Sequence, residues 1–71
     1  MVSNYGQILK DLRKSNNLTL QDVKDKTGIN VCNLCLYENA KVEPRILTIK
    51  KLADAYNISY EKLYTILQRG E

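Results

Sequence analysis

Two cysteines are the residues of this 71-residue chain whose type and spacing could do chemistry. Cys32 and Cys35 form a Cys-x-x-Cys motif at the start of a predicted helix. In redox motifs, this placement lowers the pKa of the thiols. Here the motif lacks the strand and the βαβ unit of a thioredoxin-like site, so it does not by itself indicate a redox enzyme.

No other group of residues forms a catalytic or metal-binding pattern. The chain has no histidine and only two cysteines, which argues against a structural zinc site within one chain. It has no glycine-rich phosphate loop, and its acidic residues lie mostly among lysines, where solvated charge is their usual role. We therefore expect no catalytic residue, metal, cofactor or small-molecule ligand, and we do not expect an enzyme.

Length and charge set the class of protein. A chain of 71 residues is predicted to form one domain, over residues 1–71. Its net charge of +3 suits nucleic acid, although many small domains are equally basic. The sequence shows no signal peptide and no apolar run long enough to span a membrane. We therefore expect a cytoplasmic protein with reduced thiols and no membrane contact.

Residues 19–39 are predicted to position the cysteines. Thr19 can cap a short helix, with Asp22 three residues later as a variant of the capping box. Gly28 can then leave that helix with a positive φ, and Asn30 can cap the next one. Two short helices joined by a tight glycine turn make a helix-turn-helix, whose second helix can lie in a DNA major groove.

Three further helices are predicted by apolar residues at helical spacing, over residues 5–15, 46–56 and from the Ser59 cap to about residue 68. Asn57 is predicted to stop the second of these in a left-handed conformation. The inner face of that helix is expected to carry Ile46, Ile49, Leu52, Ala53 and Tyr56. The chain is thus expected to be an all-α, compact five-helix domain.

The last predicted helix is apolar on more than one side. A terminal helix in a monomer needs only one apolar stripe, so the surplus suggests contact with a second copy of the chain. The candidate residues for this homodimer are Tyr60, Tyr64 and Leu67.

Taken together, the pattern resembles the phage repressor and Cro type (XRE-like) of helix-turn-helix DNA-binding domain. The resemblance covers residues 6–63 and rests on Gly6, Leu12-Arg13, Leu18-Thr19, Gly28-Ile29-Asn30, Tyr37-Glu38-Asn39, Pro44, Leu52-Ala53, Ile58-Ser59 and Leu63. It implies five helices, a dimer bound to double-stranded DNA at a two-fold operator, and control of transcription, with repression as the expected mode. It also implies that Arg13 contacts Glu38 and so fixes the second helix of the motif.

Four positions depart from the family pattern. Leu20 stands where the family usually has a glutamine that touches the DNA backbone. Lys24, Thr27 and Ala40 replace a usual alanine, leucine and glycine.

The outward face of the second helix, the recognition helix, departs further. It carries Val31, Cys32, Asn33, Cys35 and Leu36, and no lysine or arginine occurs from residue 27 to residue 40. Its apolar side chains could touch thymine methyl groups, while Asn33 could bond a base edge. The alternative is that this face covers another protein, as in an antirepressor or an assembly module. We favour DNA, because the scaffold pattern is specific and apolar readout is possible.

For the cysteine pair, three roles follow in order of preference: plain small side chains, a redox-sensitive DNA reader, and a metal site between subunits. Around the recognition helix, the residues expected to contact the DNA backbone are Asn17, Leu20, Asn30, Asn39, Lys41 and Arg45.

Overall fold

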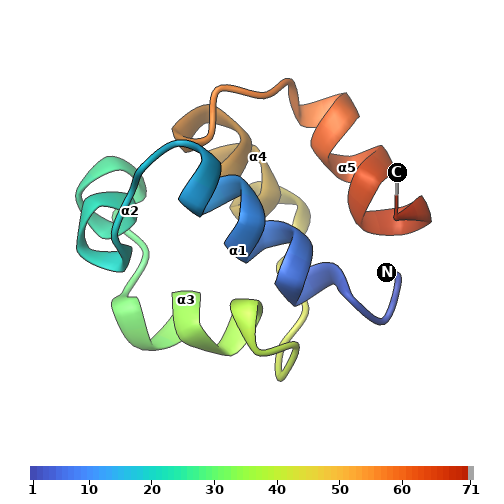
Figure 1. Cartoon of the computed structure of the whole chain (residues 1–71), viewed down its shortest axis with the longest axis horizontal. Helices are drawn as coiled ribbons and strands as arrows, with labels where there is room; N and C mark the ends of the chain where they lie inside the picture. Colours follow the sequence, from blue (N-terminus) through green and yellow to red (C-terminus); the bar gives the residue numbers. More distant parts are fainter. Residues whose placement is uncertain (71) are drawn as a thin grey trace.

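The computed structural model describes residues 1–70 and contains five helices in the order expected (Figure 1). They are α1 (Tyr5–Ser15), α2 (Leu20–Thr27), α3 (Val31–Glu38), α4 (Ile46–Ala55) and α5 (Tyr60–Arg69). No strand occurs in residues 1–70, so the predicted all-α fold is confirmed. None of the helices in this part of the chain is both long and apolar enough to cross a membrane.

Side-chain caps begin α2 and α5. The Asp22 N–H donates to Oγ1 of Thr19 at 3.1 Å, and the Thr19 N–H donates to Oδ2 of Asp22 at 2.9 Å. These two bonds form the predicted capping box, which satisfies two backbone donors that the helix itself cannot. Ser59 caps α5 through a 3.2 Å bond from the Lys62 N–H, as predicted.

Left-handed residues other than glycine follow three of the helices, while Gly28 and Gly70 end α2 and α5 in the same conformation. Asn17, Ala40 and Asn57 have φ values of 57°, 56° and 56°, which confirms the predicted stop at Asn57. After α3, the Lys41 N–H donates to the carbonyl of Leu36 at 2.9 Å, closing a Schellman turn. Ala40 therefore adopts the left-handed conformation at a position where the family usually has glycine.

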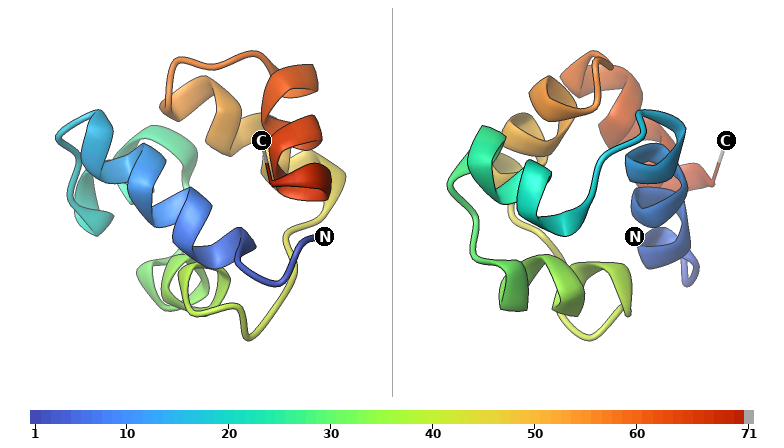
Figure 2. Two further views of the ribbon diagram at one scale, coloured as in Figure 1. Left: turned by 45° about the vertical axis from the view of Figure 1, so that its right-hand side comes forward. Right: turned by 60° about the vertical axis from the view of Figure 1, so that its left-hand side comes forward.

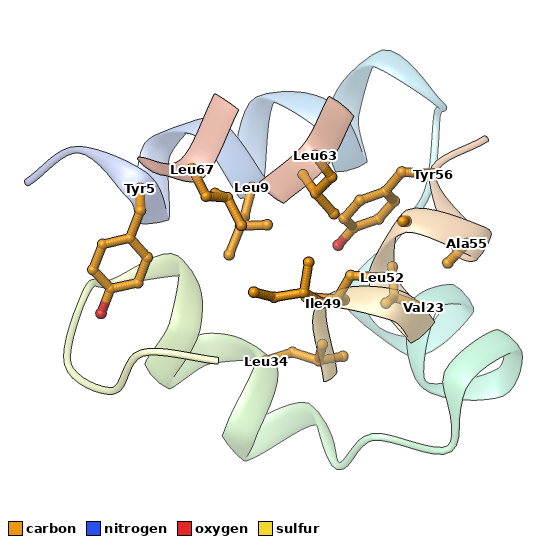
Figure 3. Packing of buried hydrophobic residues seen from close by; sticks show 11 residues of the cluster. Tyr5, Leu9, Val23, Leu34, Ile49, Leu52, Ala55, Tyr56, Leu63 and Leu67 are labelled. Carbon is orange, nitrogen blue, oxygen red and sulfur yellow. The ribbon is translucent and has the colours of Figure 1, made fainter. Parts of the chain in front are cut away.

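One core joins all five helices (Figure 3). Leu34 of α3 points toward Ile49 of α4 at the centre of this core. The fully buried side chains are Leu9, Val23, Leu34, Ile49, Leu52, Leu63 and Leu67. This packing fixes which side of each helix faces inward.

The core corrects two expectations from the sequence. Ile46 was expected on the inner face of α4, but it is 57% exposed. It is the first residue of α4, and the buried Pro44 lies inside just before it. Leu67 was expected at a dimer surface, but it has no exposed area because it packs in the core of its own chain.

Gly6 allows α1 and α3 to approach closely. A Cβ atom at this position would collide with the carbonyl oxygen of Glu38 and lie 2.9 Å from that of Tyr37. Any side chain here would therefore push the end of α3 away from α1. In the views of Figures 1 and 2, α3 lies at the edge of the molecule, away from α5.

Candidate nucleic-acid interface

The turn between α2 and α3 is set by Gly28 and Thr27. Gly28 adopts φ 76°, as predicted, and its surroundings leave open space around a Cβ, so backbone conformation alone requires glycine here. The Thr27 hydroxyl donates to the carbonyl of Val23 at 2.7 Å and accepts from the Ile29 N–H at 3.1 Å. Thr27 stands where the family usually has a leucine, and its two local hydrogen bonds stabilise the turn.

A bidentate ion pair fixes α3 against α1. Nε of Arg13 donates to Oε2 of Glu38 at 2.8 Å, and a terminal guanidinium nitrogen donates to Oε1 at 3.1 Å. The other terminal nitrogen donates to the carbonyl of Leu18 at 3.0 Å. The two side chains are only 12% and 9% exposed. The predicted contact between Arg13 and Glu38 is therefore confirmed.

Hydrogen bonding within this pair favours the charged form of Arg13. The hydrogen bond to Glu38 raises the pKa of Arg13 above its usual value, against the opposing effect of burial. The neighbouring Tyr56 is buried, and this burial, together with the charge on Glu38, raises its pKa to about 12. Tyr56 therefore remains neutral at physiological pH.

An asparagine joins the ends of α1 and α4 beside this anchor. The side-chain amide of Asn16 donates to the carbonyl of Leu12 at 2.8 Å and to that of Tyr56 at 3.2 Å. Apart from the break in the helical pattern, no local signal indicated this bridge, because its acceptor lies 40 residues away. The contact holds α1, which packs against α3, to the end of α4.

The outward face of α3 contains the five residues expected to read bases. Cys32, Asn33 and Leu36 are exposed, and Leu36 has 39% of its surface accessible. Val31 and Cys35 are half-buried on the flanks of this face. The helix thus presents one amide side chain among thiols and hydrocarbon, a surface suited to hydrogen bonding at a single point and to apolar contact elsewhere.

The residues expected to contact the DNA backbone differ in what they can offer. All but Leu20 are exposed: Asn17, Asn30, Asn39, Lys41 and Arg45. Leu20 is half-buried and packs against the core, so its first-turn backbone N–H is its only polar donor.

Asn30 corrects one detail of the predicted motif. It occupies the N-cap position of α3, but its side chain makes no capping hydrogen bond there. Its φ of −58° and ψ of 140° bring the chain into the helix without that bond. The Asn30 side chain is therefore exposed and makes no hydrogen bond to the backbone N–H groups at the start of α3.

Exposed apolar side chains also lie at places that the sequence pattern did not indicate. Val42, Ile46 and Leu47 are exposed on the loop after α3 and on the first turn of α4. On α5, where the sequence did indicate a second contact surface, Tyr64 is exposed, while Tyr60 is half-buried with its ring 5.9 Å from that of Tyr64. Hydrophobicity alone could not separate these positions from core positions.

Comparison with known proteins agrees with this geometry. Over 63 residues, or 87% of this chain, it is 36% identical to an uncharacterised HTH-type transcriptional regulator, RghRB, of Bacillus subtilis (strain 168). It is 35% identical over the same length to the HTH-type transcriptional repressor RghR of that organism. The matched regions make up 45% and 47% of those proteins, so this chain spans just under half their length.

The fold matches a solved structure as well. The crystal structure of an HTH_3 family transcriptional regulator from Vibrio cholerae superimposes with a TM-score of 0.78 and 30% identity. The match covers 89% of this chain and 35% of that one. The helix-turn-helix model HTH_3 matches residues 9–63, which include every helix from α2 to α4. The chain therefore belongs to the HTH_3 family of repressor and Cro-type (XRE-like) helix-turn-helix domains.

Proposed function

We propose that this chain binds double-stranded DNA in a sequence-specific manner and regulates transcription as a repressor. The observation that carries the proposal is the outward face of α3, which is exposed while the nearly buried Arg13–Glu38 pair fixes the helix from behind. A rigid helix on the edge of a small domain is the element that enters a major groove in helix-turn-helix proteins. The relationship to the repressor RghR adds support.

The proposed reading of bases is mainly apolar. Asn33 bonds a base edge, and Cys32 and Leu36 contact thymine methyl groups, with Val31 and Cys35 at the flanks. The exposed side chains that contact phosphates are those of Asn17, Asn30, Asn39, Lys41 and Arg45. Because α3 itself has no basic residue, Lys41 and Arg45 supply most of the electrostatic affinity near it.

Two copies of the chain are needed for a two-fold operator. The dimensions of one copy are 28 × 24 × 21 Å. Successive major grooves on one face of DNA are roughly 34 Å apart, so a single copy cannot reach both. Bound as a dimer, the protein would act by occupancy, covering the operator and obstructing polymerase.

We propose that Val42, Ile46 and Leu47 form the main dimer surface. Ile46 and Leu47 are 57% and 66% exposed, the largest values among the exposed large apolar side chains of residues 1–70. The surface follows the end of α3 along the chain, so pairing it across a two-fold axis would fix the two recognition helices relative to each other. Tyr64, with Tyr60 beside it, remains the second candidate surface.

One observation favours a second function, binding of another protein through α3. Leu36 is exposed, and no positive charge lies on the helix to attract phosphate. In this case the chain would be a helix-turn-helix scaffold, such as an antirepressor or an assembly module.

Two sets of variants separate the functions. For a DNA-binding protein, Lys41→Ala and Arg45→Ala should weaken binding to all sequences and reduce the salt dependence by about one unit for each phosphate that the variant no longer neutralises. Val31→Ser, Cys32→Ser and Leu36→Ser should mainly change the preference at individual base pairs. Binding is measured at two salt concentrations with duplexes selected from a random library.

Uracil provides the matched control on the DNA side. Replacing thymine by uracil removes only the methyl group, so affinity should fall only at positions that an apolar side chain of α3 contacts. If α3 binds a protein, Leu36→Ser should abolish partner binding while the Lys41 and Arg45 changes have little effect. Absence of salt-dependent DNA binding by the parent protein would refute the proposed function.

A further inference from the structure

The two cysteines of α3 lie where a disulfide can form within one helix. Both are free thiols; Cys32 is exposed and Cys35 is half-buried. Residues three apart in a helix have Cα atoms about 5 Å apart and directions about 60° apart around the axis. That separation lies within the range of about 4.4–6.8 Å that disulfides require. A change of side-chain rotamers can therefore bring the two sulfur atoms together.

The surroundings of Cys32 suit an anionic oxidant. Cys32 is the second residue of α3, whose first turn contains no acidic residue. The start of a helix carries the positive end of its dipole. A small anionic disulfide such as oxidised glutathione can thus approach the exposed thiol without meeting a like charge in that turn.

Cys35 lies close to the anchor of the helix. Cys35 and Glu38 are three residues apart on α3, a spacing that makes two side chains neighbours on one side of a helix. Cys35 therefore lies next to the residue that pairs with Arg13 and orients α3. A covalent change at Cys35 acts both on the outward face and next to its support.

We propose that Cys32 and Cys35 form a reversible disulfide that switches off base reading by α3, an inference that rests on the proposed function. In the first step the Cys32 thiolate attacks oxidised glutathione and displaces one glutathione thiolate. The Cys35 thiolate then attacks the Cys32 sulfur of the mixed disulfide and displaces the second. The two protein thiols lose two protons and two electrons, and one oxidised glutathione becomes two reduced molecules.

The disulfide changes the surface that meets the bases. It joins two of the five base-reading side chains covalently, so neither sulfur can adjust its position to a thymine methyl group. Because α3 carries no basic residue, it has no strong phosphate contact of its own to compensate for this change. Affinity for a specific duplex should therefore fall, while the weak non-specific affinity from Lys41 and Arg45 should remain.

The test compares reduced and oxidised states of the same protein. The reduced chain first selects a duplex from a random library, and oxidised glutathione is then added. We expect intact mass to decrease by two hydrogens with no glutathione attached, and affinity for the selected duplex to fall about tenfold or more. Dithiothreitol should restore both. Circular dichroism checks that the helices persist.

Single-cysteine variants are the matched controls, each compared with its own reduced state. Cys32→Ser leaves only the half-buried thiol, so the ratio of oxidised to reduced affinity should stay near one. Cys35→Ser should retain glutathione on Cys32 and form no internal disulfide. A parent protein that also retains glutathione, or that forms the disulfide without losing affinity, would overturn the inference alone. If the reduced protein selects no duplex, the proposed function fails as well.

Discussion

Arg13 and Glu38 link the stability of the domain to the orientation of its recognition helix. Their three hydrogen bonds join α1, Leu18 of the α1–α2 loop and the end of α3. Both side chains are nearly buried, so each charge depends on the other for solvation. Loss of one partner leaves the other charge in a poorly solvated place.

We predict that Glu38→Ala destabilises the domain by about 3 kcal/mol, the cost of leaving Arg13 unpaired in a mostly buried site. Asp25→Ala removes the same charge from an exposed position of α2 and should change stability by less than about 0.5 kcal/mol. Urea unfolding of both variants measures the difference. Equal midpoints for Glu38→Ala and the parent would mean that the pair contributes no more than an exposed ion pair.

Ala40 offers the opposite case, a residue whose replacement should stabilise the fold. Its φ of 56° costs an L-residue about 1–2 kcal/mol, and glycine avoids that cost while losing more entropy on folding. We therefore predict that Ala40→Gly stabilises the domain by about 0.5–1 kcal/mol. Ala53→Gly, inside helix α4 and buried, should destabilise it by about 1 kcal/mol or more. Thermal melting compares the two, and a decrease of stability in both would refute the prediction.

At the scale of a helix, the capping box of α2 makes stability depend on pH. The Thr19 N–H donates to the Asp22 carboxylate, and this bond, with a smaller contribution from the Thr19 side chain, holds the pKa of Asp22 below the ordinary value of 3.8. A depressed pKa means that the folded state favours the ionised form. The stabilisation is therefore present above pH 3.8 and is lost as the pH falls through the lower folded pKa.

We predict that Asp22→Asn lowers the melting temperature at neutral pH and that its difference from the parent shrinks as the pH falls below about 4. Asp25→Asn, on the same helix, is the control, because its carboxylate bonds only the exposed Gln21 side chain. Melting curves between pH 2 and pH 7 follow both variants. A difference that stays constant with pH would show that the charge of Asp22 does not stabilise the cap.

At the scale of the whole molecule, the exposed apolar residues are the candidates for contact between copies of the chain. Apart from Leu36 on the outward face of α3, they lie at two places, the Val42, Ile46 and Leu47 surface and Tyr64 on α5. Tyr60, the neighbour of Tyr64, already has the Lys50 ammonium 5.4 Å from its ring. Part of the α5 face is thus used within one chain, which leaves the surface after α3 as the better candidate for a partner copy.

We predict that the parent protein dimerises at micromolar concentration and that Leu47→Lys shifts it to monomer, because a charge would be buried in an apolar interface. Tyr64→Lys should leave the dimer intact. Sedimentation velocity, with and without DNA, distinguishes the species. If only Tyr64→Lys dissociates the dimer, the α5 face is the interface; a monomer at all concentrations would rule out both.

Much of the fold could be predicted from the sequence because its signals are local. The capping box of Thr19 and Asp22, the positive φ of Gly28 and the left-handed stop at Asn57 each depend on residues within one turn. Helical spacing of apolar residues then indicated the five helices. The contact between Arg13 and Glu38 spans 25 residues of sequence, and only the family resemblance indicated it.

Tertiary packing determined which apolar residues are buried, and helical periodicity alone could not predict this. The last helix is apolar on several sides, so its pattern did not distinguish the buried Leu67 from the exposed Tyr64. Ile46 fits an inner stripe by spacing, but it begins its helix beside the buried Pro44 and faces outward. The need for glycine at position 6 arises only because the backbone of Glu38 meets it in space. Each outcome depends on which distant segment fills the space beside a residue, and a local pattern carries no information about that segment.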